Sequence, residues 1–556
     1  MKLIIKISLV IIISLFFFSF LSCSSNGISV KPDTPEDITP GGAGLLPPGD
    51  GNGDGDGDGD GDGDIDIDTD VDGILDDEDN CVDIANEDQA DTDADGIGDA
   101  CDDESGAADD DDNGIAIKER TPQAVSNIFG DFKELLSGGG AGEWGSSNYA
   151  TSISFGYLEN DDQMNIGVSR YAISNSTTKR FFSYEFVSEG NKTKIIDGTA
   201  ECDADEWVVD TAFGVVAGEN VMAVATYSGI DGLAWPTVRI YNSQGTNLYE
   251  MAEYGLYIVP TSIAMGDIDG DGTDEILVGR MKVDVNNLGE EAEFSDNKYP
   301  RWSVYKYING SFDETFCGGG NNDDGDYPCM ITSETNWSTS SYTTDVAMGD
   351  FDGDGNDEIG IARKIENSTA DKFFVYKYDG GSLTNLLKGN GGVSREANVT
   401  GIDFGVIDGT NVVGISRKTT TTGNSRLKTY DIDGNIVVEL GSDLNDGIYA
   451  NDFSFGDLNG DGNDEIIIGL ADSNNEFSAQ ADPRWYVYKS DASILLCGGG
   501  NPTYHDCSVE ESQNGWGEGA YVTSVAAGDV DGDGKEEFGI ARYSTSSNDK
   551  WYVFGY

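Results

Sequence analysis

Hydrophobic and polar residues alternate over many short stretches between residue 121 and the C-terminus, and no stretch of useful length shows a helical period. One kind of stretch alternates regularly, as at 275–279. A second kind is rich in aromatic and β-forming residues, as at 301–307, and a third is weaker, as at 493–497. Alternation with a period of two is typical of strands that bury one face. The pattern therefore predicts an all-β region built from short strands.

These stretches belong to a unit that recurs along the chain. Four copies are well preserved and begin at Ser262, Asp345, Asp452 and Ser524, whereas three degraded copies begin at Ser152, Thr211 and Ile402. The glycines that the copies share lie about 62 residues apart on average. They are Gly156, Gly214, Gly266, Gly349, Gly405, Gly456 and Gly528. Four short strands per unit, repeated radially, predict a seven-bladed β-propeller of four-stranded blades, with an undetected eighth blade as the alternative.

The two ends of the repeat region predict how the ring closes. The chain stops at Tyr556, after the third strand of the last unit, and a strand-like segment near 126–137 precedes the first copy. We expect this N-terminal segment to supply the missing fourth strand of the last blade. Closure of this kind removes an exposed sheet edge.

Charge and composition narrow the possible partners. The chain has 103 acidic and 32 basic residues and a net charge of −71, which repels nucleic acid and anionic lipid headgroups but suits divalent cations. Its single histidine, His505, leaves little room for histidine-based catalysis or transition-metal sites. Aromatic residues make up 10% of the chain, so it is not simply disordered.

The four well-preserved copies each contain an acidic loop with possible metal ligands at positions 1, 3, 5, 7 and 9. Oxygen ligands in a flexible loop select Ca²⁺ over Zn²⁺ or Cu²⁺, and glycines at positions 4 and 6 let the backbone fold tightly round an ion. The side chain is the expected ligand except at position 7, where the carbonyl of the residue would serve. The four sets are Asp267, Asp269, Asp271, Thr273 and Glu275; Asp350, Asp352, Asp354, Asn356 and Glu358; Asp457, Asn459, Asp461, Asn463 and Glu465; and Asp529, Asp531, Asp533, Lys535 and Glu537.

A Phe/Met-Gly pair, an Asp-rich loop and a following strand make these units resemble FG-GAP repeats, also called VCBS-type repeats, of the kind found in integrin α-subunit propellers. The resemblance implies about four Ca²⁺ ions in the propeller, a cell-surface or cell-adhesion role, and a face that engages proteins or glycans. The loops at 157–165, 215–221 and 406–412 lack a first ligand or are too short. We expect those three blades to be free of metal.

A second acidic pattern lies at 68–102, after a Gly-Asp tract. Aspartates there occupy relative positions 1, 3, 5, 9 and 12 of two tandem loops, without the flanking helices of an EF-hand. They are Asp68, Asp70, Asp72, Asp76 and Asp79, followed by Asp91, Asp93, Asp95, Asp99 and Asp102. Together with Cys81 and Cys101, this segment resembles a thrombospondin type 3 repeat. The resemblance implies a stalk that binds two or more Ca²⁺ ions.

The N-terminus reads as an export signal. Lys2 and Lys6 precede an apolar run at 7–21, and Cys23 follows where the run stops, as in bacterial lipoprotein signals. We expect lipidation at Cys23 and attachment to the bacterial cell envelope, at the outer membrane or the cell surface. An uncleaved anchor and an ordinary signal peptide are the alternatives. No later stretch is apolar enough to span a membrane.

The expected organisation is a signal peptide (1–22), a flexible tether (23–63), the thrombospondin type 3-like repeat (64–104), an acidic linker (105–120) and the propeller (121–556). Cysteines that lie close in sequence suit local disulfides in an exported protein. The pairs are Cys81 with Cys101, Cys317 with Cys329, and Cys497 with Cys507.

This architecture predicts a calcium-binding surface protein that displays a propeller to an extracellular protein or glycan. The inserts at 281–300, 317–343 and 497–520 are candidates for the recognition surface. Four tryptophans outside the repeat core either stack on sugars from exposed loops or pack within blades: Trp144, Trp235, Trp337 and Trp516. The alternative function is a polysaccharide lyase-like calcium propeller. No constellation of catalytic residues singles out such a site.

Overall fold

The computed structural model divides the chain into units at 1–123 and 124–556, and all the residues that it describes belong to the second. The sites expected at Cys23, at the stalk aspartates, and at Cys81 and Cys101 therefore lie outside the described residues. The described residues are 132–140, 143–144, 149–159, 163–171, 179–198, 206–230, 233–252, 257–284, 287–294, 299–320, 327–331, 337–365, 368, 370–392, 398–419, 424–442, 444, 447–472, 483–499, 516, 520–544 and 548–555.

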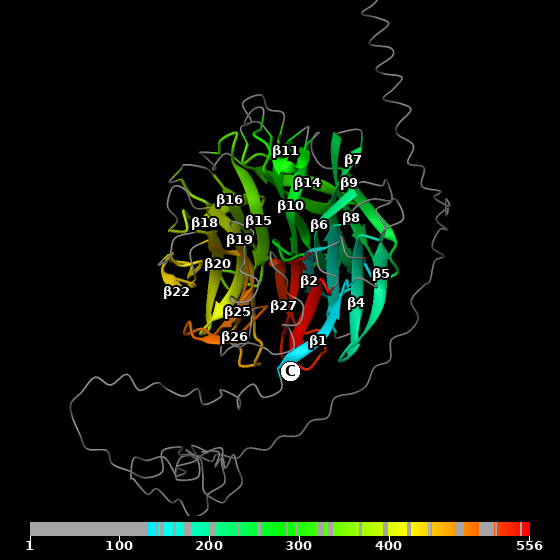
Figure 1. Ribbon diagram of the computed structural model, residues 1–556. Coiled ribbons are helices and arrows are strands. Elements are labelled where there is room, and N and C mark those ends of the chain that lie inside the picture. Colours follow the sequence, from blue (N-terminus) through cyan, green and yellow to red (C-terminus); the bar gives the residue numbers. More distant parts are fainter. Residues whose placement is uncertain are drawn as a thin grey trace, which may run out of the picture. The chain divides into compact units, whose positions relative to one another are not determined.

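These residues form seven antiparallel sheets arranged around a central axis, as expected for a seven-bladed propeller (Figure 1). Each blade has four strands, which follow sequence order from the axis outward in blades 1 to 6, and blade 3 carries one additional strand, β12. In blade 7 the outer strand is β1. Blades 1 and 2 contain β2 (Tyr149–Gly156), β3 (Asn165–Tyr171), β4 (Phe181–Ser188), β5 (Asn191–Gly198), β6 (Glu206–Val216), β7 (Glu219–Ile230), β8 (Leu233–Tyr241) and β9 (Asn247–Ala252).

Blades 3 and 4 contain β10 (Ile258–Gly266), β11 (Glu275–Asp284), β12 (Asn287–Glu291), β13 (Trp302–Ile308), β14 (Ser311–Gly318), β15 (Tyr342–Gly349), β16 (Glu358–Lys364), β17 (Phe373–Asp379) and β18 (Ser382–Gly389). Blades 5 and 6 contain β19 (Asn398–Ile407), β20 (Thr410–Lys418), β21 (Leu427–Tyr430), β22 (Ile436–Leu440), β23 (Ile448–Gly456), β24 (Glu465–Asp472), β25 (Trp485–Tyr488) and β26 (Ile494–Gly498). Blade 7 contains β27 (Tyr521–Gly528), β28 (Glu537–Tyr543), β29 (Trp551–Gly555) and β1 (Lys133–Gly138).

Blade 7 closes the ring in the predicted way, because its outer strand comes from the N-terminal side of the propeller. Strand β1 pairs antiparallel with β29, with Gly138 opposite Trp551. A Cβ atom on Gly138 would lie 2.6 Å from the Trp551 ring, so the glycine gives the indole room at the seam. The prediction of seven blades is confirmed, and the eight-blade alternative is wrong.

The hydrophobic core lies between neighbouring sheets rather than within one layer. The second strand of a blade is buried on both faces, as in β16, because it is covered by the blades on each side. One cluster joins Leu277 and Trp302 of blade 3 to Ile359 and Phe374 of blade 4. Burial of each such side chain contributes about 1.5–3 kcal/mol, so the contacts between blades stabilise the ring.

The Phe/Met-Gly pair of the repeat is explained by contact between neighbouring inner strands. The glycine that ends one inner strand faces an aromatic or Met side chain of the next blade, except that Gly456 faces Ala527. A Cβ atom on Gly405 would lie 2.3 Å from the Phe455 ring, and one on Gly156 would lie 2.3 Å from Phe213. The repeat therefore keeps glycine at this position because two blades approach too closely there for a larger residue.

Each inner strand also carries a β-bulge at the same level. The extra residues are Thr151, Val209, Thr261, Thr344, Thr400, Asn451 and Thr523. Several of them bond to the next blade; for example, the Thr400 hydroxyl donates to the Ala450 carbonyl at 2.7 Å and the Thr523 hydroxyl donates to the Ala150 carbonyl at 2.9 Å. The bulges therefore turn polar side chains toward a belt of hydrogen bonds between blades.

Candidate cation-binding loops and axial pocket

Four acidic loops connect the first and second strands of blades 3, 4, 6 and 7. In blade 3 the loop contains Gly270 (φ 72°) and Gly272 (φ 80°), a left-handed conformation that favours glycine. The same positions have positive φ in the other three loops, at Gly353, Gly355, Gly460, Gly462, Gly532 and Gly534. Two left-handed glycines in five residues fold each loop back on itself.

The first carboxylate of each loop organises the backbone. Oδ1 of Asp267 accepts a hydrogen bond from the Gly270 N–H at 2.8 Å, and Oδ2 accepts one from the Gly272 N–H at 2.8 Å. Asp350, Asp457 and Asp529 make the same bonds in their loops. At position 9, Oε2 of Glu358 accepts from the Phe351 N–H at 2.8 Å. The other carboxylate oxygen of this glutamate, Oε1, is buried inside the loop and accepts no hydrogen bond.

The first carboxylate also converges with other acidic side chains of its loop. In three loops, one oxygen from each of three acidic side chains lies within 4.8 Å of the other two. These groups are Asp267, Asp269 and Asp271; Asp350, Asp352 and Glu358; and Asp529, Asp531 and Glu537. In the blade 6 loop, Asn459 stands at position 3 and its amide donates to Glu465 at 3.0 Å. Three of the four loops therefore bring together three of the side chains that were predicted as ligands.

Two observations show that these groups fit a cation. Oδ1 of Asp269, Oδ1 of Asp352 and Oε1 of Glu358 are buried without a hydrogen-bond donor, which is costly for an anionic oxygen. Burial also raises the pKa of Glu275, Glu358 and Glu465 to about 7, and that of Glu537 to about 8. A divalent cation would satisfy the oxygens and hold these carboxyl groups ionised.

Two lysines that the sequence analysis missed place a positive charge beside the carboxylates of the blade 3 and blade 4 loops. The Lys306 ammonium, from β13, contacts Asp269 and lies 3.0 Å from Asp271 and 3.1 Å from Glu275. Lys377, from β17, contacts Asp352 and lies 2.6 Å from Asp354. Hydrogen bonds to these carboxylates hold the pKa of Lys377 above its usual value.

A lysine of the third strand does not accompany every acidic loop. In blade 7 the corresponding position is Gly555, where a Cβ atom would lie 2.5 Å from Glu537. The signal in the sequence was the Val-Tyr-Lys run of the third strand, which is Val-Phe-Gly in blade 7. Strand register, which places this residue beside the loop, was needed to interpret it.

A second set of residues that the sequence analysis missed is the acid at position 8 of each loop. Oδ2 of Asp274 accepts a hydrogen bond from the Val215 N–H of the preceding blade at 2.8 Å, and the Asp274 N–H donates to the Val215 carbonyl at 2.7 Å. Asp357, Asp464 and Glu536 make the equivalent pair of bonds to Asp267, Val406 and Asp457. Position 8 is acidic in all four copies, which was the available signal. We call these four residues the inter-blade acids.

Blades 2 and 5 replace the loop with short turns. The central residues are Ala217 and Gly218 (φ 54° and 77°) in blade 2, and Asp408 and Gly409 (φ 49° and 70°) in blade 5. Positive φ at both central residues is the geometry of a tight hairpin turn that matches the twist of the strands. In the described part of these two turns and of the blade 1 connection, no three acidic side chains converge.

The exposed-loop interpretation of the tryptophans is wrong for three of the four. Trp144, Trp337 and Trp516 are only 5–7% exposed. Each stacks on an aromatic side chain of a third strand, and each is covered by an arginine guanidinium: Arg170, Arg363 and Arg542 respectively. They pack blades together, which was the alternative. The side chain of Trp235 lies outside the described residues.

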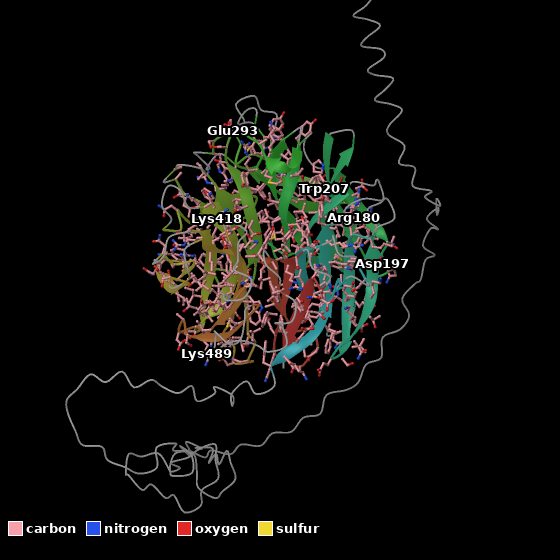
Figure 2. The ribbon with its side chains drawn as sticks, in the orientation of Figure 1. Arg180, Asp197, Trp207, Glu293, Lys418 and Lys489 are labelled. Atoms are coloured by element: carbon pink, nitrogen blue, oxygen red, sulfur yellow. A yellow bond between two sulfur atoms is a disulfide. The ribbon has the colours of Figure 1, made fainter. Side chains whose placement is uncertain are left out.

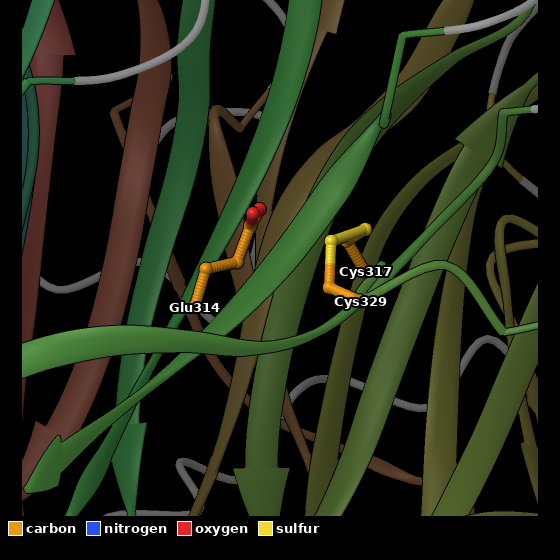
Figure 3. A group of neighbouring side chains, drawn as sticks. All are labelled: Glu314, Cys317 and Cys329. Carbon is orange, nitrogen blue, oxygen red and sulfur yellow. A yellow bond between two sulfur atoms is a disulfide. The ribbon is translucent and has the colours of Figure 1, made fainter. Parts of the chain in front are cut away.

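The predicted disulfide between Cys317 and Cys329 is confirmed, with its sulfur atoms 2.06 Å apart (Figure 3). Glu314 lies close to the pair. Because both sulfurs are consumed by the bond, these three residues are not a thiolate metal site. Cys507, the predicted partner of Cys497, lies outside the described residues.

A cavity of about 760 Å³ lies on the axis at the opposite end from the acidic loops. Its lining includes residues from the first halves of all seven inner strands, such as Thr151, Pro260 and Thr523, whereas the loops follow the ends of these strands. Sequence analysis did not predict it, because it exists only when all seven blades come together.

Fold and loops thus define the chain as a seven-bladed β-propeller with four acidic, oxygen-rich loops on one side. A scan of the chain against protein-family models found no match, and a search of curated proteins found none either. No helix among the described residues has the length and hydropathy that a membrane crossing requires.

Proposed function

We propose that the chain is a calcium-stabilised recognition propeller that is exported, anchored at the cell surface and binds an extracellular protein or glycan. The observation that carries the calcium part is the convergence of carboxylate oxygens in the acidic loops, with the Lys306 and Lys377 ammonium groups at two of these points. The loops contain only oxygen donors, which are the ligands that Ca²⁺ prefers.

The proposed ions stabilise the ring and take no part in chemistry. Positions 1, 3, 5 and 9 would hold each ion by side-chain oxygens and position 7 by its carbonyl. The inter-blade acid at position 8 then connects the ordered loop to the preceding blade, as Asp464 does to Val406. Extracellular modules bind Ca²⁺ at about 10⁻⁴–10⁻³ M, so the sites would fill outside the cell.

Export and anchoring rest on the basic and apolar N-terminal residues and on Cys23. A lipid at Cys23, a tether and a calcium-binding stalk would display the propeller away from the membrane. Metabolic labelling with a palmitate analogue tests this part: the wild type should be labelled and Cys23→Ser should not. Labelling of both proteins would contradict it.

The experiment that tests the calcium part compares the full chain with a variant in which the four loop glutamates are replaced: Glu275→Gln, Glu358→Gln, Glu465→Gln and Glu537→Gln. Calorimetric titration and native mass spectrometry should show fewer bound Ca²⁺ ions in the variant. The stalk is unchanged, so any stalk ions remain in both proteins. The propeller should also lose its Ca²⁺-dependent rise in Tm.

A control variant removes the same four charges from exposed positions outside the loops: Glu189→Gln, Asp313→Asn, Asp379→Asn and Asp433→Asn. It should bind the same number of ions as the wild type. Equal Ca²⁺ binding by the loop variant and the wild type would refute the calcium assignment. Recognition is tested separately, with arrays of glycans and extracellular proteins in the presence of Ca²⁺.

A further inference from the structure

An arc of aromatic side chains runs past one side of the axial cavity, and four of its rings line the cavity: Tyr149, Tyr171, Trp207 and Tyr227. Six rings from blades 7, 1 and 2 follow one another in contact, with centroids 4.6–6.4 Å apart. In order, they are Tyr521, Tyr543, Tyr149, Tyr171, Trp207 and Tyr227. All six are half-buried, so each keeps some surface accessible. We call them the aromatic arc.

Strand pairing explains why the rings gather there. Tyr149 pairs with Tyr171 across β2 and β3, and Tyr521 pairs with Tyr543 across β27 and β28. Trp207 pairs with Tyr227 in the same way in blade 2. The corresponding pair in blade 5 is Asn398 with Lys418, on another part of the ring (Figure 2). The arc is thus confined to adjacent blades, whereas in blade 4 the cavity lining contains a separate aromatic residue, Tyr342, which pairs with Lys364.

Below the arc, the cavity is lined by hydroxyl and amide groups from the bulge residues and their neighbours, including Thr344, Thr400 and Asn451. Most of these groups bond to the next blade. Thr261 is different, because its Oγ1 has no hydrogen-bond partner in the protein and is fully buried, out of reach of a ligand in the cavity. Together with the aromatic rings, the bulge residues give the cavity wall both apolar and polar surface.

Buried aspartates also reach the cavity but are used within the protein. Oδ2 of Asp210 accepts from the Ile263 N–H at 3.0 Å, and Oδ2 of Asp452 accepts from the Val525 N–H at 2.8 Å. Burial raises the pKa of both carboxyl groups. With a net charge of −71 on the chain, the field at the cavity disfavours an anionic ligand.

We propose that the axial cavity and the aromatic arc form a binding site for the end of a neutral oligosaccharide. Sugar rings would stack on the rings of the arc that line the cavity, and their hydroxyls would bond to the polar groups below. Aromatic faces combined with a few placed polar groups are the usual composition of a ligand pocket, and about 760 Å³ is within the usual range of about 300–1,000 Å³. This inference rests on the proposed recognition function and assigns it a site and a ligand class.

The test uses the full chain in Ca²⁺ and measures binding by calorimetry. The probes are neutral glucan, mannan, galactan and chitin oligosaccharides, with uronic acid oligomers as the charged comparison. At least one neutral series should bind to the wild type. Trp207→Ala should weaken that binding by about tenfold or more, since base–aromatic stacking losses on this scale are known for other ligands. Tyr249→Ala is the matched control, since Tyr249 contacts Tyr307 away from the cavity.

A second variant guards against misfolding of the first. Trp207→Phe keeps an aromatic ring beside Tyr227, so its melting temperature should stay close to that of the wild type. Its affinity for the neutral sugar should fall severalfold, less than in Trp207→Ala, because a smaller ring face is left for stacking. Tyr249→Phe is its control, because Tyr249 lies outside the cavity lining.

The outcomes separate this inference from the proposed function. Binding of a glycan that neither Trp207→Ala nor Trp207→Phe weakens would keep the recognition function and refute the axial site. Binding of uronic acid oligomers alone, or of no oligosaccharide, would refute the ligand class. Calcium binding and the response of Tm to Ca²⁺ are read in the same samples, and their loss would count against the calcium part alone.

Discussion

Blades 3, 4, 6 and 7 connect their first two strands by long acidic loops, whereas blades 2 and 5 make the same connection with tight turns. The sheets that follow are the same four-stranded sheets in both groups. A blade therefore folds without a cation site, because left-handed residues such as Gly218 and Gly409 suffice to reverse the chain. What both groups retain is a bond to the inter-blade acid of the next blade, as Val215 and Val406 show. The acidic loop adds cation dependence to a connection that is made in either case.

Removal of calcium should have the largest effect, and it should act only through the blades with acidic loops. A site that is filled at a hundred times its Kd adds about 2.7 kcal/mol to the free energy of unfolding, so several filled sites should raise Tm strongly. Calorimetric scans with EDTA and with Ca²⁺ measure this. If the two scans coincide, the loops are ordinary acidic turns.

The next largest effect is the pH dependence of the unfolding free energy that Asp403 causes in blade 5, which has no acidic loop. Burial raises the pKa of Asp403, on the inner strand of blade 5, from 3.8 to about 7. The folded state then holds this proton more tightly than the unfolded state, so the stabilisation is complete below about pH 4 and is lost as pH rises through 7. The shift corresponds to about 4 kcal/mol at most.

Asp403→Asn should therefore show a smaller fall in unfolding free energy between pH 4 and pH 8, measured in denaturant titrations with EDTA. The Asp403→Asn variant also loses one hydrogen-bond acceptor, because the two carboxylate oxygens of Asp403 accept from the N–H groups of Phe404 and Phe455. An unchanged pH dependence would contradict the assignment of this fall in stability to Asp403.

A substitution at position 1 tests the loop directly. Asp457→Asn replaces a carboxylate that accepts three backbone hydrogen bonds, and it should remove one bound Ca²⁺ and cost about 1–3 kcal/mol. Asp408→Asn makes the same change in the exposed turn of blade 5, where we expect less than about 0.5 kcal/mol. Equal effects at the two positions would remove the distinction between loop and turn.

The inter-blade acids should matter whether or not calcium is bound. Asp464→Asn weakens one bond to the Val406 N–H and should cost about 1 kcal/mol in both EDTA and Ca²⁺. Chemical denaturation under the two conditions gives the comparison. A cost seen only in Ca²⁺ would instead make Asp464 part of the ion site.

The smallest effect concerns the lysine beside the blade 3 loop. Lys306→Met removes an ammonium group that contacts three of the loop carboxylates, so calcium should bind this loop severalfold more tightly. Without calcium the variant should lose about 0.2–1 kcal/mol, as for a partly exposed ion pair. Lys388→Met, at an exposed lysine 3.6 Å from Asp371, is the control. Unaltered calcium affinity in Lys306→Met would show that the ammonium does not compete.

The features that the sequence predicted are those written into each repeat. Blade number and the closing strand followed from strand alternation and from shared glycines such as Gly405, and the convergence of acidic side chains in three loops followed from their spacing. The inter-blade acids, Lys306 and the aromatic arc were missed because each depends on register between strands or blades. Trp337 shows the converse error: a large aromatic outside the repeat suggested an exposed site, but an arginine and a phenylalanine bury it.

The pairing of β1 with β29 has a mechanical consequence. If the chain is held by its N-terminal side while the propeller grips a ligand, the load enters the ring at Lys133, the first residue of β1. The five residue pairs of this seam then carry the tension before any other blade does. Resistance to pulling would be set by one short strand, and detachment of that strand would open the ring at blade 7 while the other six sheets remain paired.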